Sequence, residues 1–261
     1  MNRIRCDRTP AWGQLQAAFA ATGRAFDVRR AFAADPARFA AFSQNAPHVF
    51  ADLSKNRIDA TTEALLLELA QQTGLAAHRD AMFAGESINS TEQRPVMHWL
   101  LRTPPLDPAM PAQSVHRHMA ETLHEVHTTL DAMLVFAEQV RADAQITDIV
   151  NIGIGGSDLG PRMAVHALAA FEQPDISVHF VSNLDSADLA STLTRLNPRT
   201  TLFIVASKTF TTLETMANAH TARNWVKAAA NDDKAIGHHF VAASTNLAAT
   251  AEFGIAPENV F

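Results

Sequence analysis

The segment 207–212 carries a dense set of groups that could bind an anion. It reads Ser-Lys-Thr-Phe-Thr-Thr and directly precedes a predicted helix over 213–229. Hydroxyl groups, an ammonium and the free amides at the start of a helix all favour negative charge. The T-x-x-E spacing of Thr211 and Glu214 predicts a capping box, which accounts for these two residues structurally. The other polar side chains suit a phosphate monoester, and we predict that they bind one: Ser207, Lys208, Thr209 and Thr212.

A glycine-rich turn at 153–160 is a second candidate for ligand binding. Glycines between a strand and a helix let backbone amides approach an anion closely. Two nucleotide-binding motifs fail here. The dinucleotide pattern needs glycine where Asp158 stands, and a Walker P-loop needs lysine where Pro161 follows Gly160. The structural alternative is a tight turn in which glycine is merely permitted.

The two loops together predict a site for a small phosphorylated ligand, with the glycine loop close to a polar substrate and the hydroxyl loop neutralising its phosphate. Nucleic acid would instead require many phosphate contacts over a basic surface. The chain has 21 basic and 27 acidic side chains, a net charge of -6, and no basic stripe. An RNA-binding arm or transit peptide in the Arg-rich first 50 residues is disfavoured because aspartates interrupt the basic residues.

Histidine is frequent, with 12 residues, and a cluster at 116–127 raises the question of a metal site. The sequence His124-Glu125-Val126-His127 is H-E-x-H, which lacks the one-turn spacing of the H-E-x-x-H zinc helix. His124 and His127 could still meet at i, i+3. A solvated helical face is the favoured interpretation, so we predict no metal.

The composition excludes several classes of protein. Of the 261 residues, 47% are hydrophobic and 18% are charged, which is typical of a folded globular chain. Cys6 is the only cysteine, so disulfides within the chain are excluded and a reducing cytoplasm is expected. No apolar run approaches the roughly 18 residues that span a bilayer, so no membrane association is expected.

Hydrophobic periodicity divides the chain into two regions. Amphipathic helices are predicted through 11–82, followed by a proline-bearing stretch at 86–112 and a helix over 123–140. Four short apolar runs then alternate with helix-length segments, at 147–154, 176–182, 201–206 and 240–243. This alternation predicts an α/β fold with a doubly wound parallel sheet. We expect a mainly helical region at 1–118 and a parallel-sheet domain at 119–261 that binds a small phosphorylated ligand.

Several collinear motifs resemble the glucose-6-phosphate isomerase family, also called phosphoglucose isomerase. The segment 150–161 resembles that family's glycine loop, and 207–212 continuing into Glu214-Thr215 resembles its sugar-phosphate loop. Further matches occur at 180–185, at 54–58 and at 89–102, where a glycine is usual at the position of Gln93. The resemblance runs from about Thr9 to Phe261.

The resemblance implies an aldose-ketose isomerase of glycolysis and gluconeogenesis, which interconverts glucose 6-phosphate and fructose 6-phosphate through a cis-enediol. It implies sugar-isomerase-type (SIS) α/β domains, a cytoplasmic homodimer, a hexose phosphate substrate and no cofactor. Carried over by motif, Gly156 and Ser157 would border the sugar, while Ser207, Lys208, Thr209 and Thr212 would hold the phosphate.

The segment 251–261 resembles the stretch just before the family's Gly-Gly-Arg-Tyr-Ser motif. The chain is therefore expected to be the amino-terminal half of the enzyme, inactive alone, with the catalytic residues expected beyond Phe261 and none in this chain. Two other functions remain open, a non-catalytic sugar-phosphate-binding module and a nucleotide-dependent oxidoreductase.

Overall fold

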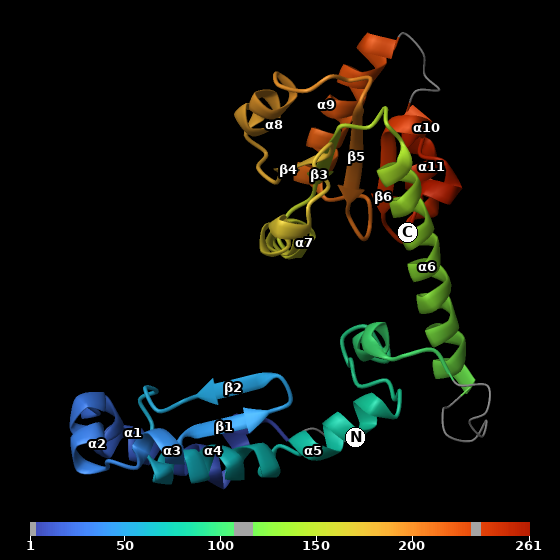
Figure 1. The fold of residues 1–261 in the computed structure, drawn as a ribbon. Helices are drawn as coiled ribbons and strands as arrows, with labels where there is room; N and C mark the ends of the chain where they lie inside the picture. Colours follow the sequence, from blue (N-terminus) through green and yellow to red (C-terminus); the bar gives the residue numbers. More distant parts are fainter. Residues whose placement is uncertain (1–3, 107–116, 231–235) are drawn as a thin grey trace. The chain divides into compact units, whose positions relative to one another are not determined.

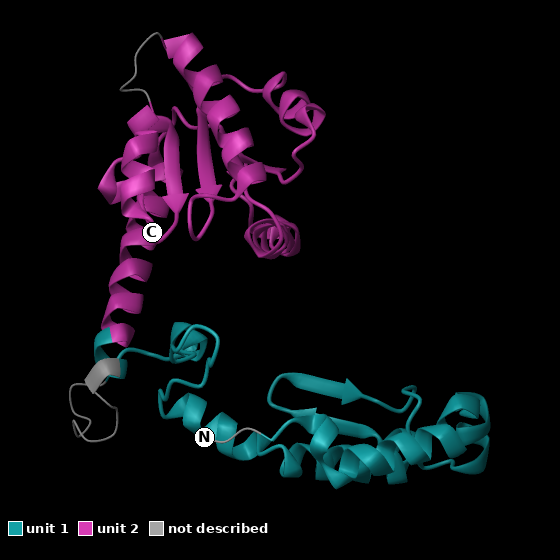
Figure 2. Ribbon diagram, turned by 180° about the vertical axis from the view of Figure 1, so that it is seen from behind, with its two compact units in different colours: residues 1–121 teal, residues 122–261 magenta. Residues whose placement is uncertain are grey.

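The computed structural model describes residues 4–106, 117–230 and 236–261. The chain forms two compact units, residues 1–121 and 122–261, coloured separately in Figure 2. In the part of the chain that the structure describes, no helix is long and apolar enough to cross a membrane.

Unit 1 is mainly helical. Helices α1 and α4 pack against each other, and Thr9 begins α1 by accepting a hydrogen bond from the Trp12 amide, with proline in the first turn. The helices are α1 (Pro10–Ala21), α2 (Val28–Ala34), α3 (Arg38–Ala41), α4 (Ala60–Gln72) and α5 (Leu75–Phe83), with 3-10 turns at Cys6–Arg8, Gly23–Ala25 and His98–Arg102.

A β-hairpin corrects the prediction of helices throughout 11–82. Strands β1 (Ser43–Ala46) and β2 (Val49–Asp52) pair antiparallel around the two residues Pro47 and His48. Proline holds its own φ near -65°, and His48 adopts a left-handed φ of 62°, a combination that reverses the chain. The backbone conformations of these two residues reverse the chain, although the apolar residues around them have the spacing of a helix.

The motif at 54–58 has a structural function in unit 1. The buried Arg38 side chain donates to the backbone carbonyls of Ser54, Asn56 and Ile58 at 2.8–2.9 Å. Its guanidinium also lies 4.5 Å from the centre of the Phe42 ring. A buried charge needs such partners, because an unpaired one is strongly unfavourable. The motif therefore helps to hold the start of α3 against the segment that leads into α4.

The unusual Gln93 lies at a position of backbone strain. Asn89 and Arg94 close a tight loop through mutual backbone hydrogen bonds. Within it Gln93 adopts a φ of 55°, the left-handed region that glycine enters freely and that costs other residues about 1–2 kcal/mol. Glycine at this position would avoid that cost.

Unit 2 contains the predicted parallel sheet (Figure 1). Its strands are β3 (Asp148–Ile152), β4 (Ser177–Val181), β5 (Thr201–Ala206) and β6 (Phe240–Ala243), and every pairing is parallel in the order β4-β3-β5-β6. The helices are α6 (Arg117–Ala142), α7 (Gly156–Ala167), α8 (Ser186–Leu193), α9 (Leu213–Ala230), α10 (Ile236–His239) and α11 (Leu247–Phe253), with 3-10 turns at Ala169–Phe171 and Pro257–Asn259. The predictions of the four strands and of an α/β fold are confirmed.

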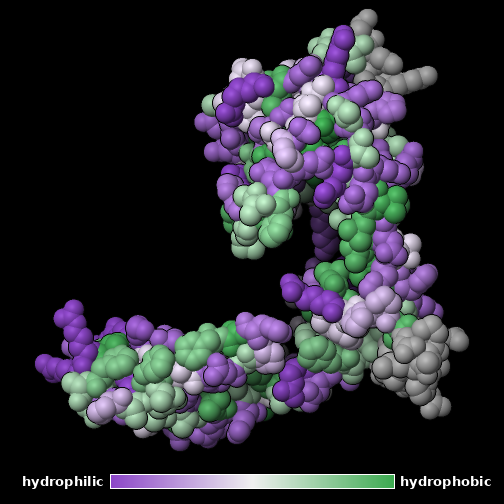
Figure 3. Space-filling model, in the orientation of Figure 1, coloured by the Kyte–Doolittle hydropathy of each residue, from purple (hydrophilic) through white to green (hydrophobic). Residues whose placement is uncertain are grey.

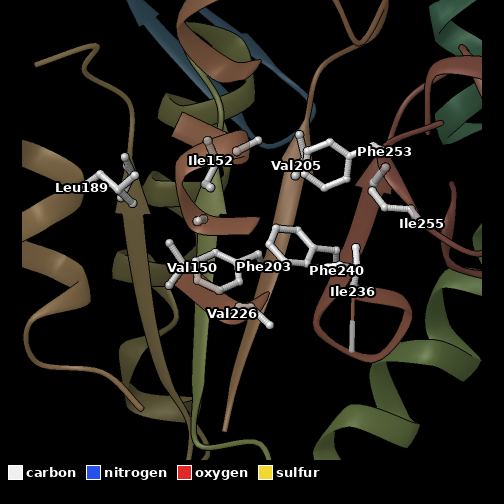
Figure 4. Close-up of a cluster of buried hydrophobic side chains, with 14 of the residues drawn as sticks. Val150, Ile152, Leu189, Phe203, Val205, Val226, Ile236, Phe240, Phe253 and Ile255 are labelled. Carbon is white, nitrogen blue, oxygen red and sulfur yellow. The ribbon is translucent and has the colours of Figure 1, made fainter. Parts of the chain in front are cut away.

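One face of the sheet packs into the main core, shown in Figure 4. Alternate strand residues point to this face, where they meet buried side chains of α8, α9, α10 and α11. Phe203 is fully buried, with its ring stacked 4.9 Å from that of Phe240 and edge-on to Trp225. This aromatic cluster ties β5, β6 and α9 together.

The opposite face is covered less completely. Apolar residues of β3, β5 and β6 face Phe136 and Val140 of α6 and, with residues of α7, line an apolar hollow of about 630 Å³. The ring of Phe261 also lines it and lies 5.5 Å from that of Phe136. Met133 of α6 also lines this hollow and is partly exposed, as are its neighbours Leu134 and Val135, and Figure 3 shows hydrophobic surface over this helix.

We expect Phe203→Ala to lower the free energy of unfolding by about 3–5 kcal/mol, because it removes a buried ring and leaves a cavity between β6 and α9. Phe171→Ala is the control, since Phe171 is 83% exposed and should change stability by less than about 0.5 kcal/mol. Urea unfolding followed by circular dichroism measures both. Equal unfolding midpoints for the two variants would contradict this account of the core.

Candidate functional site

The two predicted loops meet at the topological switch point of the sheet. Strands β3 and β5 are neighbours, and the connection after β3 leads to β4 on one side of this pair, whereas the connection after β5 leads to β6 on the other side. In open parallel sheets, ligands bind at the carboxyl ends of the strands at such a point. The glycine loop follows β3 and the hydroxyl loop follows β5. A Cβ built on Gly153 would lie 3.2 Å from the Cβ of Ala206, so the two strand ends are in direct contact.

The glycine loop has two positions that exclude a side chain for different reasons. At Gly153 a Cβ would lie 2.8 Å from both the Cβ and the carbonyl oxygen of Ser157, closer than atoms pack. Gly155 has a φ of 57° and a ψ of -122°, a conformation available essentially to glycine. Glycine is therefore required at both positions by the backbone and its immediate neighbours, which agrees with the alternative of a tight turn. The loop turns at once into α7, with Gly155 and Gly156 exposed.

Asn151 anchors the start of α7 to β3. Pro161 lies inside α7 and has no N–H, so it cannot donate to the carbonyl of Ser157 four residues earlier. The buried Asn151 side chain replaces it, since its Nδ2 donates to that oxygen at 2.9 Å. This bond and the close approach of Gly153 hold the Ser157 backbone against the end of the strand.

Asp158 is neutralised within α7. Its buried carboxylate forms an ion pair with Arg162, with Nη2 and Oδ1 2.8 Å apart. The Arg162 guanidinium also lies 5.1 Å from the centre of the Phe180 ring at β4. The acidic side chain that excludes a dinucleotide motif thus has a local structural partner.

The hydroxyl loop is a compact turn with one buried aromatic anchor. The Phe210 amide donates to the Ser207 carbonyl at 3.1 Å, and Phe210 adopts a φ of 55°. Its buried ring packs edge-on against Phe253 of α11 at 5.6 Å. Ser207 Oγ lies 3.3 Å from Thr212 Oγ1, so these two hydroxyls face one another across the turn.

The capping box predicted for Thr211 and Glu214 is not formed. Helix α9 begins at Leu213, so Thr212 occupies the position before it, and the Thr212 carbonyl accepts from the Met216 amide. Thr211 Oγ1 instead lies 2.7 Å from Thr209 Oγ1. The left-handed turn at Phe210 delays the helix, which leaves Thr211 in the loop.

Several donors of the hydroxyl loop are available to a ligand. Lys208 and Thr209 are exposed, and no carboxylate among the described residues forms an ion pair with Lys208. Within the same described ranges, the backbone amides of Lys208, Thr209, Thr211 and Thr212 donate to no acceptor in the protein. Free amides, an unneutralised ammonium and the amino terminus of α9 together favour an anion.

The third polar strand end, which follows β4, is occupied by its own contacts. The Asp188 carboxylate accepts from the amides of Ser182 and Asn183 at 3.1–3.2 Å. The buried Asn218 of α9 donates to the Asn183 carbonyl at 2.8 Å. This loop therefore supports the neighbouring helices, and it offers fewer free groups than the hydroxyl loop.

The described histidines form no metal centre. His124 is exposed on α6, while His116 and the side chain of His118 lie outside the described residues. Among the side chains that the structure describes, no group of three His, Cys, Asp or Glu residues could hold a metal ion.

The comparisons with known proteins all indicate the same family. A family model described as phosphoglucose isomerase matches residues 52–261. The chain is 71% identical over 255 residues to a glucose-6-phosphate isomerase of Albidiferax ferrireducens, covering 98% of this chain and 48% of that protein. It is 61% identical to the one from Polaromonas naphthalenivorans, covering 98% and 49%. The chain thus spans about half the length of these curated relatives.

A solved structure supports the fold. The crystal structure of a glucose-6-phosphate isomerase from Chlamydia trachomatis matches with a TM-score of 0.73 and 24% identity, over 94% of this chain and 46% of that chain. A likeness at this identity concerns the fold, and it agrees with the expected SIS-type parallel sheet preceded by a helical region.

A pair of glycine variants tests the packing of the glycine loop. We expect Gly153→Ala to destabilise the protein by about 1–3 kcal/mol, because the new methyl overlaps the Ser157 backbone. Gly160→Ala is the matched control within α7. It has nothing within 4 Å of a new Cβ and should gain about 0.5–1 kcal/mol from helix propensity. Urea unfolding midpoints measure both effects, and a fully stable Gly153→Ala variant would rule out the contact.

Proposed function

The chain belongs to the phosphoglucose isomerase family, and from this premise we propose that it is the amino-terminal half of a glucose-6-phosphate isomerase. The whole enzyme interconverts glucose 6-phosphate and fructose 6-phosphate in glycolysis and gluconeogenesis, by proton transfer through a cis-enediol. It works in the cytoplasm as a homodimer without a cofactor. The observation that carries the proposal is the open, positively charged hydroxyl loop beside the glycine loop at the switch point of the sheet.

In this proposal the hydroxyl loop binds the substrate's phosphate group. Lys208 supplies a charge-assisted hydrogen bond, and the hydroxyls of Ser207, Thr209 and Thr212 and the free amides supply the rest. Gly156 and Ser157 border the sugar from the neighbouring strand end. A phosphate held at this edge positions the sugar carbons for proton transfer, which lowers the entropic part of the barrier.

The proton-transfer groups themselves are proposed to belong to the other half of the enzyme. Isomerisation needs a carboxylate or comparable base within hydrogen-bond reach of the substrate. Near the two loops, Asp158 is paired with Arg162, and Asp188 accepts from two backbone amides. Both carboxylates are committed to structure, whereas Glu214 in the first turn of α9 makes no side-chain contact that assigns it a structural role among the described residues. We propose that the catalytic residues lie in the other half of the enzyme, as the family resemblance implies.

A second candidate function is a non-catalytic sugar-phosphate-binding module. It is favoured by one observation, that the proposed phosphate ligands and the residues proposed to border the sugar all come from this chain and lie on adjacent strand ends. Such a module would bind a hexose phosphate at micromolar concentration without any further domain.

Turnover separates the two functions. We expect the pure 261-residue chain to show no isomerase activity, because it lacks the proton-transfer groups. The same chain joined to the carboxyl-terminal half of the Albidiferax ferrireducens relative should convert fructose 6-phosphate to glucose 6-phosphate in a coupled assay. Activity of the pure chain would refute the assignment of catalysis to the other half. A folded but inactive joined chain that still binds the sugar phosphate would favour the binding module.

The phosphate assignment is tested by removing its ligands in the joined chain. We expect Lys208→Ala and Thr209→Ala to weaken binding of the phosphorylated sugar at least tenfold, since a hydrogen bond to a charged group contributes about 1.5–3 kcal/mol. Binding of the unphosphorylated sugar should change much less. Titration calorimetry with both sugars measures the difference, and equal losses for the two would reject the assignment.

A further inference from the structure

The loop after β6 holds the backbone of the hydroxyl loop, although its residues were not singled out from the sequence. The Lys208 carbonyl accepts from the Thr245 amide and hydroxyl, both at 3.0 Å, and from Ser244 Oγ at 3.1 Å. The next carbonyl, that of Thr209, accepts from Asn246 Nδ2 at 2.9 Å. Two successive peptide groups are thus fixed by one neighbouring strand end.

The direction of these carbonyls decides where the amides point. In a planar trans peptide the C=O and N–H of one unit point to opposite sides. The Lys208 carbonyl belongs to the same unit as the Thr209 amide, and it is drawn toward the β6 loop. The Thr209 N–H therefore points away from β6, and it donates to no acceptor among the described residues.

The same structural unit holds the strained residue of the hydroxyl loop. Phe210 adopts its left-handed φ while its ring is buried against Phe253 of α11, the helix that the β6 loop begins. A non-glycine residue in this region costs about 1–2 kcal/mol and persists only when its surroundings impose it. Polar contacts to two carbonyls and one aromatic contact supply that constraint.

We propose that Asn246, together with Ser244 and Thr245, is a positioning element for phosphate binding. It turns the Lys208 and Thr209 carbonyls away from the ligand and the Thr209 amide toward it. This inference rests on the proposed function of the hydroxyl loop. These residues touch the loop backbone and act through it, so their effect is specific to the phosphate end of the substrate.

Asn246 has two separable functions, which makes the inference testable. Its Oδ1 accepts from the Ala249 amide at 3.2 Å and so caps α11, while its Nδ2 reaches the hydroxyl loop. Serine caps a helix about as well as asparagine but is too short to reach the Thr209 carbonyl. Asn246→Ser therefore keeps the cap and removes the loop contact.

The experiment compares Asn246→Ser and Ser244→Ala with the unmodified joined chain. We expect KM for fructose 6-phosphate and the inhibition constant of inorganic phosphate to rise together by about five- to tenfold, with kcat changed less than twofold. The control is Asp27→Ser, which makes the same kind of cap exchange at α2 in unit 1 and should leave all three constants unchanged.

The outcomes distinguish this inference from the proposed function. If Lys208→Ala weakens phosphate binding and Asn246→Ser does not, the positioning inference is wrong and the phosphate site stands. If neither substitution affects phosphate binding, both are wrong. A fall in kcat and thermal stability for Asn246→Ser, with no change in the phosphate inhibition constant, indicates a structural role only and also overturns the inference.

Discussion

The parallel pairing of β3 with β5 is the constraint on which the candidate site depends. Residues Asp148 to Ile152 of β3 pair in register with Thr201 to Val205 of β5, so both strands end at the same edge of the sheet. Adjacent strands lie only about 4.8 Å apart, so the loops that follow them must be neighbours. Gly153 makes this closeness possible, because a Cβ there would lie only 3.2 Å from the Cβ of Ala206 at the end of β5. The hydrogen-bonded pairing of β3 with β5 therefore sets the positions of the two loops, whatever polar side chains the loops carry.

The two loops meet the demands of a polar ligand in different ways. The glycine loop is tight, with backbone conformations that require glycine and an asparagine that replaces the hydrogen bond lost at Pro161. The hydroxyl loop contains a strained phenylalanine, and its conformation is imposed from outside by Ser244, Thr245, Asn246 and Phe253. The conformation of the glycine loop is determined largely by its own residues. The conformation of the hydroxyl loop depends on the neighbouring strand β6 and helix α11, and its described amides and the Lys208 ammonium stay available to a ligand.

The two faces of the sheet differ in how fully they are covered. The face toward α8, α9, α10 and α11 is a closed core with fully buried aromatic rings. The face toward α6 and α7 retains an apolar hollow, and Phe261 lies in its lining. The last residues also run beside β6, where the Phe261 amide donates to the Ala242 carbonyl and the Ser244 amide donates to the Phe261 carbonyl, both at 2.9 Å. The β6 edge, the hollow and the support of the hydroxyl loop are therefore parts of one continuous structure.

The sequence by itself determined the four strands, the α/β alternation and the identity of the polar groups at the strand ends. These follow from local patterns, since β-branched apolar runs and small polar residues act within a few positions of one another.

The hairpin of β1 and β2 was not predicted, because apolar residues at helical spacing run through the same segment. Only the two turn residues, Pro47 and His48, reverse the chain there. The boundary at Leu213, which leaves Thr211 in the loop, depends on the left-handed turn that the packing of Phe210 imposes. Only the tertiary structure decided that Asn246 supports Thr209, that Asn151 completes α7, and that Arg38 is held by the carbonyls of a distant segment. The contacts of Arg38 and Asn246 join residues 16 to 37 positions apart, and the contact of Asn151 reaches six residues along the chain to the Ser157 carbonyl. No local pattern of residue types encodes such a meeting of a side chain with a backbone carbonyl.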